Sequence, residues 1–168
     1  MKWFEFLKEA RESIDFEKYL DEHWDEVDPS ENIWFHISCE KLSEPFITAH
    51  SDKVVWRNIS KYSPLSESFM ETHQNEIDWK AISANQILSK EFCKKFATKV
   101  DWTECLSRNQ FPQDFLLELI EDPNVSIDIG NIIQNQRLSE EELRRLKKIY
   151  NDLEIERIQN RVRNHFQK

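Results

Sequence analysis

The sequence contains a single glycine, Gly130, in 168 residues. Turns that need a positive φ must therefore be few, which argues against β-hairpins and favours helices joined by Ser, Asn and Asp turns. A phosphate-binding loop and a dinucleotide-binding fingerprint each need several glycines close together, so neither motif is present. The scarcity of glycine thus predicts a helical protein and argues against enzymes that use a phosphate-binding loop or a dinucleotide-binding fingerprint.

Cysteine is also scarce, with only Cys39, Cys93 and Cys105. An odd number of cysteines without a C-x-x-C pair indicates neither a disulfide framework nor a zinc site. Reduced thiols favour an intracellular compartment. The sequence also lacks a recognisable signal peptide and an apolar run long enough to span a membrane. We therefore expect a cytoplasmic protein without a cofactor or a bound metal.

What the sequence does contain is a recurring phrase built around tryptophan. Its clearest copy covers residues 77–92, with the sequence IDWKAISANQILSKEF. Four tryptophans, spaced by 22, 23 and 23 residues, mark successive copies: Trp34, Trp56, Trp79 and Trp102. Self-similarity at a fixed period is typical of repeat proteins, in which each unit buries its apolar face on its neighbours.

The spacing within the phrase predicts two short helices per repeat. A Trp and the Ile three residues later share one face of a helix, and Asp78, Asp101 and Asp128 are placed to cap such helices. The Leu-Ser step predicts a second helix with Ser as its N-cap. We predict an all-α solenoid of short helical-pair repeats at residues 32–137, with the four tryptophans in its core. An acidic helical cap at residues 1–31 and one or two capping helices at residues 138–168 complete the single domain.

The phrase resembles the short tryptophan-centred repeats, roughly V-D-W-x-x-I-S-x-x-Q-x-L-S-E-x-F-I, of proteins from bacteriophages and large DNA viruses. The resemblance covers about residues 32–143 and is carried by Val100-Asp101-Trp102, Ile82-Ser83, Gln86, Leu88-Ser89 and Phe92-Cys93. It implies a helical repeat fold and a viral origin. It brings no catalytic motif with it, and the capping segments lie outside it.

Most of the chemically reactive side chains fall on repeat positions that are occupied by apolar residues elsewhere. Aromatic rings interleaved with basic residues can stack on nucleic-acid bases, but these tryptophans share a face with Ile and Leu, which favours core packing. His50 and His73 occupy places where later repeats have Phe or Leu, so they indicate packing sites rather than metal ligands. Cys93 and Cys105 likewise occupy apolar places. We therefore predict no catalytic residues.

Acidic residues concentrate at the beginning of the chain, where residues 1–31 hold eleven Asp and Glu against four Lys and Arg. Such a segment is either a solvated surface or a partner-binding surface that imitates nucleic-acid phosphates. The candidate partner-binding residues are Asp21, Glu22, Asp25, Glu26, Asp28 and Glu31. Together with the viral resemblance, they favour a non-enzymatic protein-binding module, an inhibitor that occludes a host nucleic-acid enzyme such as a defence (CRISPR-type) nuclease.

Two alternatives come from other classes of function. Residues 137–168 hold nine Lys and Arg against six Asp and Glu, and this basic end predicts nucleic-acid binding or self-association through the last helix. The candidate nucleic-acid-binding residues are Arg144, Arg145, Lys147, Lys148, Arg157, Arg161 and Arg163. The other alternative is a small-molecule or nucleotide binder with a polar pocket lined by Ser60, Ser83 and Gln86.

Overall fold

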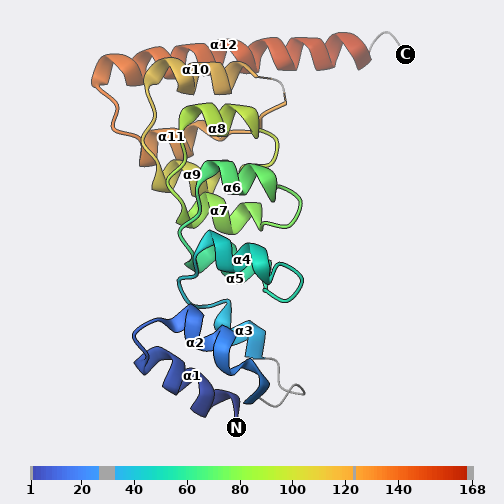
Figure 1. Ribbon diagram of the computed structural model, residues 1–168. Coiled ribbons are helices and arrows are strands. Elements are labelled where there is room, and N and C mark those ends of the chain that lie inside the picture. Colours follow the sequence, from blue (N-terminus) through green and yellow to red (C-terminus); the bar gives the residue numbers. More distant parts are fainter. Residues whose placement is uncertain (1, 27–32, 123, 166–168) are drawn as a thin grey trace. The chain divides into compact units, whose positions relative to one another are not determined.

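The computed structural model describes the backbone of residues 2–26, 33–122 and 124–165, and the side chains of these residues except Glu26 and residues 154–165. Twelve α-helices and one short 3-10 helix account for the regular structure of this part of the chain, which contains no strand (Figure 1). The prediction of an all-α protein is therefore confirmed.

Each tryptophan repeat forms a pair of short helices. The first helix of each pair begins at or next to the repeat's Trp: α3 (Ile33–Ile37), α5 (Trp56–Tyr62), α7 (Trp79–Asn85) and α9 (Trp102–Arg108). A fifth, degenerate repeat has Ile129 in place of the Trp, and its first helix is α11 (Ile129–Asn135). The second helices are α4 (Glu44–Ala49), α6 (Glu67–Thr72), α8 (Lys90–Lys95) and α10 (Gln113–Glu121). The chain begins with α1 (Trp3–Glu12), α2 (Phe16–His23) and η1 (Trp24–Glu26), and α12 (Glu140–His165) follows the repeats.

The helices group into two compact units, Met1–Gln86 and Ile87–Lys168. The division falls inside the third repeat, between α7 and α8. In the first unit, α5 packs against α7, and α1 packs against α2. In the second unit, α9 packs against α11, and α12 contacts both α10 and α11. In each unit, therefore, the first helices of two consecutive repeats lie directly against each other.

The helices begin where the sequence places capping side chains. Asp78, Asp101 and Asp128 accept hydrogen bonds from backbone N–H groups in the first turns of α7, α9 and α11, as predicted. The serines of the Leu-Ser steps cap α4, α6 and α8 in the same way: Ser43, Ser66 and Ser89. In the fourth repeat, Pro112 replaces this serine, and α10 begins without a side-chain cap.

The last helix begins with a reciprocal pair of capping hydrogen bonds. The Ser139 N–H donates to Glu142 Oε2 at 2.7 Å, and the Glu142 N–H donates to Ser139 Oγ at 3.2 Å. From there α12 runs through residues 151–152 without a break, so the C-terminal segment contains one helix rather than two. Leu146 is its fully buried anchor.

The tryptophans lie at the edge of the core, not at its centre. The fully buried position is the third residue after each Trp or its replacement, occupied by Ile37, Ile59, Ile82, Cys105 and Ile132. Trp102 is buried, whereas Trp34, Trp56 and Trp79 are half-buried, which corrects the prediction of a core made of four indoles. An indole ring carries a polar N–H, which needs an acceptor. In Trp56, Trp79 and Trp102 it donates to a backbone carbonyl five residues earlier.

Two polar positions link successive repeats, and every residue named at them except the half-buried Gln86 is buried. The first is the fourth residue after Trp, where Ser38 Oγ accepts from Val55 N–H and Ser60 Oγ accepts from Asp78 N–H, both at 2.9 Å. The second is the seventh residue after Trp or its replacement. There the side chain accepts a hydrogen bond from the backbone N–H that precedes the second helix of the previous repeat, as in Ser63, Gln86, Asn109 and Gln136.

Candidate functional site

The residues proposed to line a small-molecule pocket are used to hold the repeats together. Ser60 and Ser83 are fully buried, and each hydroxyl donates to the backbone carbonyl of its own repeat's Trp at 2.7 Å. The Gln86 amide accepts from Leu65 N–H and donates to the Ser63 carbonyl oxygen at 2.9 Å. These polar groups are therefore directed at the backbone, and small-molecule binding by them stays a prediction.

The acidic segment, by contrast, surrounds a pocket in the N-terminal unit. Asp21 and Glu22 lie on α2 and Asp25 lies in η1, and all three side chains are exposed. Of the other predicted partner-binding residues, Asp28, Glu31 and the side chain of Glu26 lie outside the described residues. The pocket has a volume of about 310 Å³ and is lined by Leu20, Asp21, Glu22, Trp24, Asp25, Trp34, Phe46, His50 and Lys53. We call it the Trp24/Trp34 pocket.

Four aromatic rings, supplied by η1, α3, α4 and the residue that follows α4, form one part of this pocket. The Trp24 and Trp34 rings have their centroids 5.0 Å apart, and Trp34 lies at the same distance from His50. His50 also packs on Phe46, four residues earlier, with the ring centroids 4.4 Å apart. The helix pair of the first repeat positions Trp34, Phe46 and His50, whereas Trp24 comes from η1.

Charged groups form the other part of the pocket. The Asp21 carboxylate oxygen lies 2.9 Å from His50 Nε2, and the Asp21 side chain is 56% exposed. The Lys53 ammonium lies 5.8 Å from the Trp24 ring centroid and 5.7 Å from that of Trp34, a distance at which a cation is attracted to an aromatic face. With His50 neutral, three carboxylates and one ammonium give the lining a formal charge of −2.

The entire net charge of the protein belongs to the unit that contains this pocket. Residues 1–86 hold 18 Asp and Glu against 9 Lys and Arg, a net of −9, whereas residues 87–168 hold 14 of each. An acidic field of this kind attracts cationic partners from a distance, and salt weakens that attraction.

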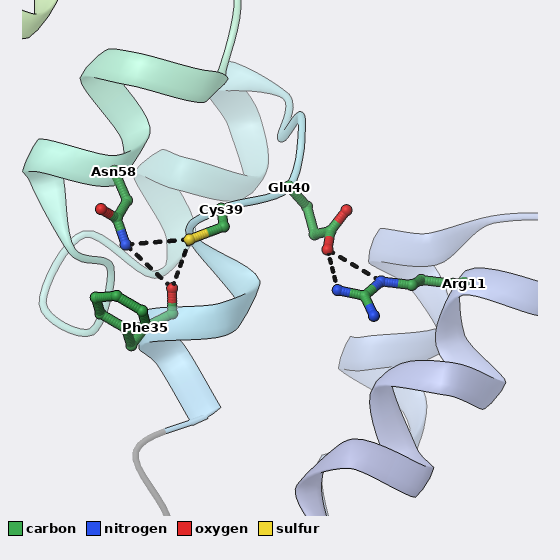
Figure 2. Close-up of polar contacts among 5 residues, drawn as sticks. All are labelled: Arg11, Phe35, Cys39, Glu40 and Asn58. Atoms are coloured by element: carbon green, nitrogen blue, oxygen red, sulfur yellow. Dashed lines mark hydrogen bonds and ion pairs between the residues drawn. The ribbon is translucent and has the colours of Figure 1, made fainter.

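The Cys39 thiol lies in a separate, hydrogen-bonded environment in the same unit (Figure 2). Its sulfur donates to the Phe35 carbonyl oxygen at 3.3 Å, and Asn58 Nδ2 donates to both of these atoms. Burial raises the pKa of the Cys39 thiol, the charge of Glu40 raises it further, and Lys61 opposes the shift. A thiol with a raised pKa has little thiolate at neutral pH, so Cys39 is poorly suited to act as a nucleophile.

The basic residues predicted to bind nucleic acid lie on α12. Arg144, Arg145, Lys147 and Lys148 are exposed, and Arg144 pairs with Glu140 at 3.1 Å. The side chains of Arg157, Arg161 and Arg163 lie outside the described residues. Lys147 and Lys148 directly follow the buried Leu146, so the exposed cations share this stretch of helix with a core contact.

The part of the chain that the structure describes contains no group of three or more His, Cys, Asp or Glu side chains arranged to hold a metal ion. His50 and His73 are half-buried against the rings of their own repeats, with His73 4.9 Å from the Trp56 ring centroid and 4.4 Å from that of Phe69. None of the described helices combines the length and apolar character needed to cross a membrane. Comparisons with protein-family models, curated proteins and solved structures found no match.

Proposed function

We propose that the chain is a non-enzymatic protein-binding module whose N-terminal unit binds a basic surface on its partner. One observation carries this proposal: the unit with a net charge of −9 places three exposed carboxylates around a pocket with an aromatic wall. Aromatic side chains bounded by charged groups are common at the centre of protein interfaces.

The repeats supply the scaffold for this surface. The contacts of α5 with α7 and of α9 with α11, together with the polar links between repeats, support a stacked solenoid with a helical cap at each end. In such stacks the core positions hold neighbouring repeats together, which leaves the remaining side chains available for a partner.

The partner that best complements this surface is an enzyme with a basic groove for nucleic acid. Acidic side chains imitate phosphate groups, and complementary charge accelerates encounter and suppresses other partners. The resemblance of the repeats to phage and viral proteins adds a biological setting, in which the module occludes a host defence nuclease in the host cytoplasm.

The proposal is tested by reversing charge at the pocket. Affinity capture from a host lysate, followed by mass spectrometry, is compared between the full chain and the variant Asp21→Lys, Glu22→Lys, Asp25→Lys. We expect a basic nucleic-acid enzyme to be captured by the unmodified chain and lost with the variant. Titration of the purified pair by calorimetry should then show an affinity that falls as salt rises, since the charges are exposed.

A matched control reverses three exposed acidic residues outside the pocket: Glu76→Lys, Glu91→Lys and Glu121→Lys. This control changes the net charge by the same amount and should retain the partner. If both variants lose the partner equally, general charge rather than this surface is responsible. If neither loses it, the acidic surface is not the binding site.

A further inference from the structure

We propose that the Trp24/Trp34 pocket binds the cationic end of an arginine or lysine side chain presented by the partner protein. This inference rests on the proposed function and specifies how the acidic surface recognises its partner. A guanidinium or ammonium is attracted to the face of an indole ring and to a nearby carboxylate, and the pocket offers both kinds of group.

Packing of the repeat accounts for only part of the pocket. The next repeat keeps the same three rings, because Trp56, Phe69 and His73 lie together with centroid distances between 4.4 and 6.3 Å. Three residues after His73, however, it has Glu76, whereas Lys53 occupies that place after His50. The second indole, Trp24, and the carboxylates of Asp21, Glu22 and Asp25 come from α2 and η1, which precede the tryptophan repeats. The second indole and the three carboxylates convert the cluster of three repeat rings into a pocket suited to a cation.

Lys53 shows where a cation sits in this pocket. Its ammonium lies over both indole rings, at 5.8 and 5.7 Å from their centroids. The side chain is exposed and belongs to the loop between α4 and α5, so a chain rotation moves it out without disturbing the core. Lys53 is therefore an internal stand-in for the ligand, and a partner's Arg or Lys competes with it for the same position.

The size of the pocket suits a side chain rather than a bare ion. A volume of about 310 Å³ is at the small end of pockets that hold organic ligands. The guanidinium fits flat against one indole while its aliphatic stem covers apolar surface, here supplied by the half-buried rings of Trp24 and Trp34. Asp21 pairs with His50, which leaves the exposed carboxylates of Glu22 and Asp25 to meet the incoming charge.

The experiment uses the full chain and three small probes: N-acetyl-arginine amide, N-acetyl-lysine amide and N-acetyl-citrulline amide. Citrulline has the shape of arginine without its charge. The indole N–H resonances of Trp24 and Trp34 are followed by NMR at constant ionic strength. We expect saturable shifts of these two resonances with the arginine and lysine probes and none with the citrulline probe over the same concentrations.

Lys53→Ala provides the decisive variant, because a misfolded protein does not gain affinity. Removing the internal competitor should tighten binding of the arginine probe by roughly threefold or more. Lys61→Ala, which removes a lysine 4.8 Å from the Tyr62 ring in the same unit, changes the net charge equally and should leave the affinity unchanged. The double variant Glu22→Gln, Asp25→Asn should weaken binding several-fold.

Equal shifts with the citrulline probe, or an unchanged affinity in Lys53→Ala, would overturn the cation site. That result is distinguishable from failure of the proposed function. A partner that is captured by the acidic unit although the probes do not bind contradicts only the cation site. If the probes bind but the charge-reversal variant captures the same proteins as the unmodified chain, only the proposed function is contradicted.

Discussion

The seventh residue after each repeat's tryptophan shows how a single polar side chain stabilises this fold. Gln136 is buried and makes three hydrogen bonds: it accepts from Phe111 N–H at 2.9 Å and donates to the carbonyl oxygens of Leu106 and Asn109, both at 2.8 Å. All three partners belong to the preceding repeat, where they lie in α9 or in the turn between α9 and α10. A satisfied amide of this kind fixes the register between two repeats.

Replacing Gln136 with alanine should lower the free energy of unfolding by about 2–3 kcal/mol, because it leaves buried backbone groups without their partners. Urea unfolding followed by circular dichroism measures the change. Gln134 is exposed in α11, the helix that ends directly before Gln136, so Gln134→Ala should alter the free energy of unfolding by less than about 0.5 kcal/mol. Equal effects of the two substitutions would contradict the role assigned to Gln136.

The Cys39 thiol gives a second prediction for a single residue. Its pKa is raised by burial first and by Glu40 second, so the thiolate fraction at neutral pH is smaller than in a free thiol. Alkylation by iodoacetamide at about pH 7.5 should be slower than that of glutathione, and the rate should continue to rise with pH beyond the ordinary thiol range. Mass spectrometry identifies the labelled residue.

Glu40→Gln should accelerate this labelling, because it removes a charge that raises the Cys39 pKa and releases Arg11 from its ion pair. Cys93 and Cys105 are fully buried and should react only when the protein unfolds. Labelling of Cys39 that is faster than that of glutathione would contradict the raised pKa.

At the scale of the helix, the sequence predicts where an element begins better than what lies inside it. An N-cap is a local arrangement in which a side chain accepts a hydrogen bond from the first turn of the helix. Asp78 and Ser89 therefore indicate directly where α7 and α8 begin. The positions of Ser60 and Gln86 depend instead on the neighbouring repeat. Ser60 follows the buried Ile59, and Gln86 lies one helical turn after the buried Ile82. Periodicity cannot tell a polar group that faces another backbone from one that faces water.

The same limit explains why the core and the candidate site were only partly predicted. The tryptophans share a helix face with the buried Ile, yet Trp34, Trp56 and Trp79 are only half-buried at the edge of the core, where the indole N–H of Trp56 and of Trp79 donates to a backbone carbonyl. The acidic segment was recognisable from charge alone. Its pocket was not, because Trp34, His50 and Lys53 approach α2 through folding over distances that no local pattern records. A useful signal was present in the sequence: a serine recurs four residues after Trp34, Trp56 and Trp79.

The capping pair that begins α12 makes this helix sensitive to acid. The backbone N–H of Ser139 lowers the pKa of Glu142, and the Ser139 side chain lowers it further. A carboxyl group whose pKa is lower in the folded state stabilises that state above its unfolded pKa, and the contribution is lost as the pH falls through the lowered pKa. The start of α12 should therefore loosen on acidification and not on raising the pH.

The amide resonance of Ser139 reports this titration directly. Its chemical shift should change with a midpoint below the ordinary glutamate pKa of about 4.3. In Glu142→Gln, which preserves the capping geometry, the shift should show no such transition over the same range. A midpoint at or above the ordinary value would show that the hydrogen bond from Ser139 does not form in solution.

At the scale of the whole molecule, charge is distributed so unevenly that the two units should bind partners of different charge. The first unit has a net charge of −9 and the second has none. Within the described side chains of α12, the four exposed cations are balanced by Glu140, Glu141, Glu142 and Asp152. Nucleic-acid binding depends on cations that replace condensed counterions on the phosphates, and this stretch offers no surplus of them.

We therefore expect no binding of single- or double-stranded oligonucleotides at about 0.15 M salt, measured by fluorescence anisotropy. The informative variant replaces Arg144, Arg145, Lys147 and Lys148 with glutamine. A truncation after residue 137 is a poorer test, since it also removes the fully buried Leu146 and the packing of α12 on α10 and α11. If the full chain binds oligonucleotides in a salt-sensitive manner and the glutamine variant does not, the basic helix is the functional surface. Nucleic-acid binding would then replace protein binding as the proposed function. The acidic unit would in that case repel the nucleic acid and leave α12 as the surface that binds it.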